Sequence, residues 1–282
     1  MLLLALDTST RQASLALCTE DELLGEYTWQ VGTNHSIELL DRVQRMFAEC
    51  NKTMQDIEGV AVATGPGSFN GLRVALATAK AIAFALKKPI VGLSTLDIIA
   101  AQQSQWNGPI CAILEAGRSE LYAACYSFDK VCDSNGRMTS TLHQFGDYLL
   151  LSPQQVAGYL REQVSAWIGT PGERALPSFL FCGEISPLSR QVLYSEMQEK
   201  SLFVDSIQST RHASTLATFA LQRLRDGKED SPLLLEPLYL RRPAITTSTR
   251  KQPLLGGKIN RPKGHSPAGP STTEREEGAL RH

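Results

Sequence analysis

A glycine-rich turn between an apolar run and a long alanine-rich run is the feature that most constrains how this chain folds. The apolar run, residues 60–63, is flanked by glycines and has the composition of a buried strand. The turn, residues 65–71, leads into a stretch that reaches residue 86 with no further glycine or proline, which favours a helix. The segment therefore predicts a strand, a tight loop and a helix in direct succession.

Two interpretations fit this loop, and the sequence leaves both open. Backbone N–H groups at the start of a helix attract anions, so the loop is a candidate phosphate site. Its glycines are spaced G-x-G-x-x-x-G, unlike a P-loop or a dinucleotide fingerprint, and the alternative is a tight turn in which glycine only permits positive φ. The candidate residues for a vestigial cleft are Asp7, Thr8, Gly65, Gly67, Ser68 and Gly71.

The helix predicted over residues 71–86 is apolar on almost every side. Its strongly polar side chains are Arg73, Thr78 and Lys80, and a helix of this kind is normally buried on more than one face. Sixteen residues are too few to cross a membrane, so we expect the second face to contact another protein chain. Residues 35–50 have the spacing of an amphipathic helix, and we expect this helix to share the interface. The candidate interface residues are His35, Leu39, Val43, Met46, Arg73, Leu76 and Lys80. The alternative is that these are ordinary core residues.

Composition excludes several classes of function. The 282 residues carry a formal net charge of −1, which argues against a chain that binds nucleic acid strongly by itself. No apolar run reaches bilayer length, and Asp7 follows the first leucines closely, so we expect no signal peptide, no membrane contact and a cytoplasmic location. The six cysteines form no C-x-x-C pair and the five histidines no H-x-x-x-H pair, so we expect no metal site.

The order of predicted elements repeats once along the chain. Strands and helices follow as β-β-β-α-β-α in residues 1–105 and again in residues 106–242, and helix 211–225 is expected to pack back on the first half. This α/β order resembles the two ribonuclease-H-like lobes of the actin, Hsp70 and sugar-kinase superfamily. Residues 243–282 are rich in Pro, Gly, Ser and Thr and are basic, which predicts a disordered tail. The tail is either a solvated extension or a segment that contacts RNA through its charge.

Several segments together resemble one protein family. The segments are LALDTSTRQASLAL (4–17), NHSIELL (34–40), VATGPGSFNGLRVALATAKAIA (62–83), PIVGLSTLDIIA (89–100), EAGRSELYAACY (115–126) and PLYLRRP (237–243). The family is TsaB, also called YeaZ, of the bacterial system that makes threonylcarbamoyladenosine (t6A) in tRNA. It usually has Thr where Asn70 stands and Asp where Glu115 stands, and the tail has no counterpart in the usual pattern.

The resemblance implies that the chain is a subunit without catalytic residues, and that it acts together with a catalytic subunit related to it. The implied partners are the metal-bearing transferase TsaD and the ATPase TsaE, with tRNA reached through the complex and ATP used by the complex. A homodimer is an alternative state of the free chain. An older label for the family is peptidase-like, but no Ser/His/Asp set or metal-ligand pair can be placed here.

The second function class is an independent ATP-dependent phosphotransferase or ATPase of the same fold. Asp7 would then orient a metal–phosphate complex, although Asp also serves as a turn former. A working enzyme would need a second acidic loop in the other lobe, where the chain offers only residues 115–118.

Overall fold

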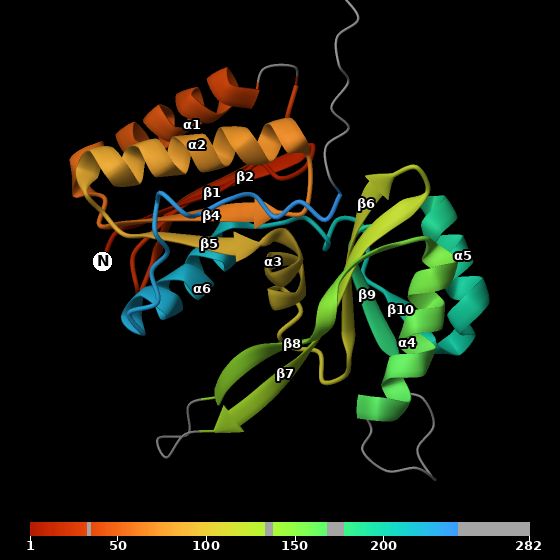
Figure 1. Cartoon of the computed structure of the whole chain (residues 1–282). Coiled ribbons are helices and arrows are strands. Elements are labelled where there is room, and N and C mark those ends of the chain that lie inside the picture. Colours follow the sequence, from red (N-terminus) through yellow and green to blue (C-terminus); the bar gives the residue numbers. More distant parts are fainter. Residues whose placement is uncertain (33–34, 133–137, 168–177, 242–282) are drawn as a thin grey trace, which may run out of the picture. The chain divides into compact units, whose positions relative to one another are not determined.

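The computed structural model describes residues 1–32, 35–132, 138–167 and 178–241. Residues 1–243 form one compact unit, and residues 244–282, with the predicted tail, lie outside the described part. The unit contains two five-stranded sheets (Figure 1).

The first sheet has the order β3-β2-β1-β4-β5. Short polar turns join its first three strands as antiparallel neighbours, whereas β4 and β5 are added in parallel after helical crossovers. The strands are β1 (Leu3–Asp7), β2 (Gln12–Cys18), β3 (Leu23–Gln30), β4 (Gly59–Gly65) and β5 (Ile90–Ser94).

The second sheet repeats this plan. Its order, β10-β9-β6-β7-β8, places the strands as the first sheet does: two antiparallel neighbours on one side of its first strand and two parallel strands on the other. The strands are β6 (Ile110–Gly117), β7 (Glu120–Cys132), β8 (Met138–Leu151), β9 (Phe179–Glu184) and β10 (Ser201–Phe203). The duplication predicted from the element order is therefore confirmed in the strand order.

Helices cover both faces of the first sheet, which explains why its central strands are apolar without alternation. Leu4 and Leu6 pack in one core cluster with α1 (His35–Glu49) and α2 (Phe69–Leu86). Leu3 and Ala5 point the other way, into a second cluster with α6 (Ala213–Arg225). In Figure 1, α1 and α2 accordingly lie on one side of β1 and α6 on the other.

The second sheet has its own core against two further helices. The helix α4 (Pro153–Trp167) packs on β7 and β8, and α5 (Pro187–Met197) packs on α4 and β10. Ser152 is the N-cap of α4, because its Oγ accepts a hydrogen bond from the backbone N–H of Gln155 at 3.3 Å.

Three elements differ from the prediction. The helix α3 (Thr95–Ala101) was not predicted, and β8 covers 14 residues although its sequence favours only a weak strand over residues 141–145. The helix α2 begins at Phe69, because Ser68 serves as its N-cap, and so has 18 residues rather than sixteen. That length and composition suffice to cross a membrane, but its buried stripe packs on β4, as in the core helix of a globular domain.

Candidate functional site

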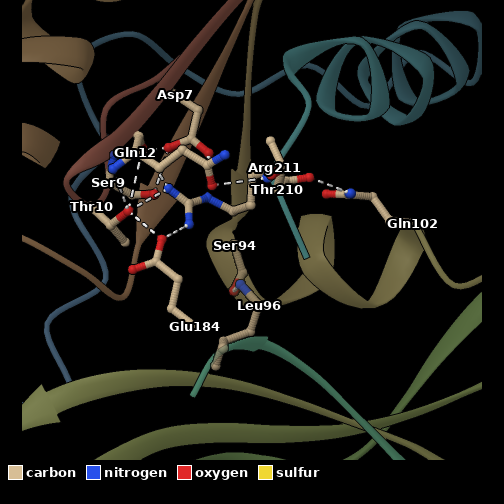
Figure 2. A network of polar contacts seen from close by, with 10 residues as sticks. All are labelled: Asp7, Ser9, Thr10, Gln12, Ser94, Leu96, Gln102, Glu184, Thr210 and Arg211. Carbon is tan, nitrogen blue, oxygen red and sulfur yellow. Dashed lines mark hydrogen bonds and ion pairs between the residues drawn. The ribbon is translucent and has the colours of Figure 1, made fainter. Parts of the chain in front are cut away.

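A buried arginine lies where strands of the two sheets end (Figure 2). The side chain of Arg211 is 1% exposed. Its Nε donates a hydrogen bond to Asp7 Oδ2 at 2.9 Å, and its Nη1 donates to Glu184 Oε1 at 2.5 Å. Its Nη2 donates to Thr10 Oγ1 and to the carbonyl oxygen of Gln12, both at 2.7 Å. One guanidinium thus binds two carboxylates and two further oxygen atoms.

The local fold explains why these groups meet. Asp7 is the last residue of β1 and Glu184 the last of β9, so each carboxylate stands at the carboxyl end of a parallel strand pair. Ser9 binds the other carboxylate oxygen of Asp7, since the N–H and the hydroxyl of Ser9 donate to Asp7 Oδ1 at 2.8 and 2.5 Å. Arg211 lies two residues before the start of α6 rather than opening it, because the helix begins at Ala213 after the N-cap residue His212.

Electrostatics favour the charged form of the arginine. Burial by itself lowers the pKa of Arg211, but the negative charges of Asp7 and Glu184 outweigh that effect and raise it. The guanidinium therefore remains charged, and Asp7, itself 1% exposed, has a permanent cation beside it.

The glycine loop is packed tightly on the turn after β1. Ser68 N–H donates to the carbonyl oxygen of Ser9 at 2.5 Å, and Thr8 Oγ1 donates to the carbonyl oxygen of Gly71 at 2.7 Å. A Cβ at position 67 would lie 2.1 Å from Ser9 O, and one at position 71 would lie 1.9 Å from Thr8 O. Glycine is therefore required here for the close approach of two backbone segments of the same chain.

The predicted cleft residues divide into two groups. Gly67 and Ser68 line a cavity of about 370 Å³, together with Arg11 and, from the second sheet, Gly117 and Glu184. The remaining candidates are buried in the packing beneath it: Asp7, Thr8, Gly65 and Gly71. A neighbouring cavity of about 400 Å³ also contains Arg11, Glu115 and Glu184 in its walls. Among the described residues, no group of three His, Cys, Asp or Glu side chains is placed to hold a metal ion.

The predicted interface residues also divide. Burial leaves Leu39, Val43, Met46 and Leu76 between 0 and 5% exposed in the core of the first lobe, because the stripes of α1 and α2 face each other and the sheet. Their side chains are thus packed inside this lobe.

The polar candidates lie at the surface of α2 or outside the described part. Arg73 is exposed, and its guanidinium lies 5.1 Å from the centre of the Phe69 ring. Lys80 Nζ donates a hydrogen bond to the carbonyl oxygen of Leu235 at 3.0 Å, which ties α2 to the segment after α6. The side chain of His35 lies outside the described residues.

Sequence reasoning missed Arg211 and Glu184. The two residues are 27 positions apart, and Arg211 is 204 positions from Asp7, so no local spacing links them. The available signal was a carboxylate at the end of each predicted central strand, Asp7 in the first half and Glu115 or Glu184 in the second. Two such carboxylates that meet in a fold repel each other unless a cation or a shared proton lies between them.

The duplicated sheet order, with a polar site where β1 and β9 end, places the chain in the two-lobed α/β class of actin, Hsp70 and the sugar kinases. A family model described as TsaD, tRNA N6-adenosine threonylcarbamoyltransferase, matches residues 29–249, and the chain belongs to this family, on its TsaB (YeaZ) side.

Named relatives and a solved structure agree with this assignment. The chain is 28% identical to "tRNA threonylcarbamoyladenosine biosynthesis protein TsaB" of Bacillus subtilis, over 77% of this chain and 86% of the relative. It is 26% identical to the protein of that name from Escherichia coli, over 86% and 95% of the two chains. The structure of YeaZ from Pseudomonas aeruginosa superposes with a TM-score of 0.64 at 25% identity and covers 85% of this chain and 99% of that one.

Proposed function

We propose that the chain is the non-catalytic subunit of the cytoplasmic assembly that makes threonylcarbamoyladenosine in tRNA. Its partner is the transferase TsaD, with the ATPase TsaE as third member, and ATP is used by the complex. The name of its relatives supports the pathway, and its membership in the family of the transferase supports pairing between two subunits of one fold.

The main support for a non-catalytic role is the ion pair between Asp7 and Arg211. A carboxylate that orients a metal–phosphate complex must be open to the metal, whereas Asp7 is 1% exposed and bound by the guanidinium at 2.9 Å. The glycine loop is likewise packed on residues of the turn after β1. The chain thus retains the fold while its own side chains and backbone occupy the groups that nucleotide chemistry requires.

We further propose that the outer face of α2 binds the partner. The buried stripe of α2 faces the sheet, and the outer face carries mainly small side chains at Ala77, Ala81 and Ala85, with Phe84 74% exposed. Small side chains allow another helix to approach closely, and an exposed phenylalanine supplies an anchor. Leu40, 49% exposed on α1, adds an apolar group on the helix that packs beside α2.

The interface is tested by a charge on the outer face that leaves the core untouched. Ala81→Glu should weaken binding to TsaD by about tenfold or more, since it buries an unpaired carboxylate in the contact. The matched control is Thr218→Glu, which places the same charge on an exposed position of α6 and should bind as wild type does. Titration calorimetry with purified TsaD measures both.

The outcomes separate the two parts of the proposal. Unchanged binding of Ala81→Glu would contradict the interface on α2, and failure of the wild-type chain to bind TsaD would contradict the function itself. We also propose that the free chain pairs two copies through the same face. Sedimentation of the wild-type chain alone should then show a dimer that Ala81→Glu converts to a monomer.

A further inference from the structure

The backbone at Arg211 is bound by hydrogen bonds on both sides. Its N–H donates to Gln12 Oε1 of the first lobe at 3.0 Å, and the preceding carbonyl oxygen, that of Thr210, accepts from Nε2 of Gln102, the residue after α3, at 2.7 Å (Figure 2). The helix that follows, α6, packs on β1 and β2. The guanidinium therefore starts from a fixed base and extends to Glu184, the carboxylate of the second lobe.

The groups around the guanidinium form a cage of oxygen atoms. Asp7 Oδ2, Thr10 Oγ1 and the carbonyl oxygen of Gln12 belong to the first lobe, and Glu184 Oε1 belongs to the second. Thr10 Oγ1 also donates to Glu184 Oε1 at 2.6 Å, so the second-lobe carboxylate is bound from two directions. Two carboxylates brought this close would repel each other if no cation lay between them.

We propose that Arg211 is a built-in cation that clamps the two lobes, so that the chain holds one lobe arrangement without a bound metal ion or nucleotide. The single positive charge attracts a carboxylate from each lobe. Three of its hydrogen bonds go to the first lobe and the fourth goes to Glu184, so the guanidinium fixes the spacing between the ends of β1 and β9. This inference is independent of the proposed pathway, because it concerns the isolated chain.

The clamp predicts a specific chemical rescue. Arg211→Ala removes the cation and leaves a guanidinium-sized space between two carboxylates, so Tm should fall by at least about 6 °C. Low-millimolar guanidinium chloride should restore part of that loss. Equal sodium chloride should not restore it, nor should urea, which has the same planar shape without the charge. The control Arg45→Ala, at an exposed pair on α1, should show no rescue.

A second measurement reports on the lobes themselves. In Arg211→Ala, hydrogen–deuterium exchange should rise in the peptides that contain the ends of β1 and β9, and guanidinium should reverse the rise. If Arg211→Ala is recovered only unfolded, Glu184→Gln decides, because it removes a carboxylate that is 38% exposed and leaves Arg211 paired with Asp7. Faster exchange at the ends of both strands in Glu184→Gln supports the clamp.

Three results would overturn the proposal. The first is an Arg211→Ala variant with the Tm and exchange of wild type. The second is rescue by urea or sodium chloride equal to rescue by guanidinium, since the space would then need filling but no charge. The third is unchanged exchange in Glu184→Gln, since the second lobe would then not depend on the ion pair.

Discussion

Gly71 lies very close to the turn after β1, and we therefore expect its replacement by alanine to destabilise the chain, although helix propensity alone would predict stabilisation. Replacement of a helical glycine by alanine usually stabilises a protein by about 1 kcal/mol. At position 71 the new Cβ would lie 1.9 Å from the carbonyl oxygen of Thr8, so two backbone segments must separate. Overpacking costs about 1–3 kcal/mol, and the hydrogen bond from Thr8 Oγ1 to Gly71 O contributes about 1 more.

We therefore expect Gly71→Ala to destabilise the chain by about 2 kcal/mol, which lowers Tm by about 4–8 °C. The matched control is Gly158→Ala in α4, where a Cβ meets nothing within 4 Å and propensity alone should raise Tm by about 2–4 °C. Thermal unfolding followed by circular dichroism measures both variants. A Gly71→Ala variant as stable as wild type would refute the close packing of the loop.

Two further predictions concern titratable groups. Burial raises the pKa of Asp97, although Tyr126 and Tyr148 donate hydrogen bonds to its Oδ1 at 2.7 and 3.0 Å. The folded state then binds the proton of the Asp97 carboxyl more tightly than the unfolded state does. The contribution of this carboxyl to the free energy of unfolding is therefore complete in acid and is lost as pH rises from about 4 through the raised pKa. Wild type should lose stability relative to Asp97→Asn across that window in urea unfolding at stepped pH, and a constant difference would contradict the raised pKa. Burial likewise raises the pKa of the Cys18 thiol to about 11. Iodoacetamide at mildly alkaline pH should therefore leave Cys18 unmodified in the folded chain and modify it in urea, and rapid native labelling, seen by peptide mass spectrometry, would be the contrary result.

Local sequence patterns were sufficient for most of the fold. Apolar runs such as residues 60–63 lie between two helical layers, so continuous hydrophobicity alone marks them as strands. The cap of α4 follows from the pair Ser152 and Pro153, which acts within one turn. The helix α3 was missed because it begins directly after β5, with Ser94 as both the last strand residue and the N-cap.

The site was harder to predict because its interactions are long-range. Asp7 and the glycine loop were recognised as candidates, but their neighbours come from residues far along the chain, above all Arg211 and Glu184. The apolar stripes of α1 and α2 likewise showed that both helices are buried. They did not show that Leu39 and Leu76 face the lobe's own core while Ala81 faces outward, because periodicity gives the faces of a helix and not their neighbours.

The central claim is that this chain contributes a folded partner surface and no chemistry of its own. The most direct measurement is t6A formation on tRNA by the purified components, analysed as nucleosides by mass spectrometry, with and without this chain. The account predicts that omission of the chain abolishes t6A, while the chain alone turns over no ATP beyond the level seen with Asp7→Ala. Normal t6A formation without the chain, or ATP turnover by the isolated chain that Asp7→Ala removes, would contradict it.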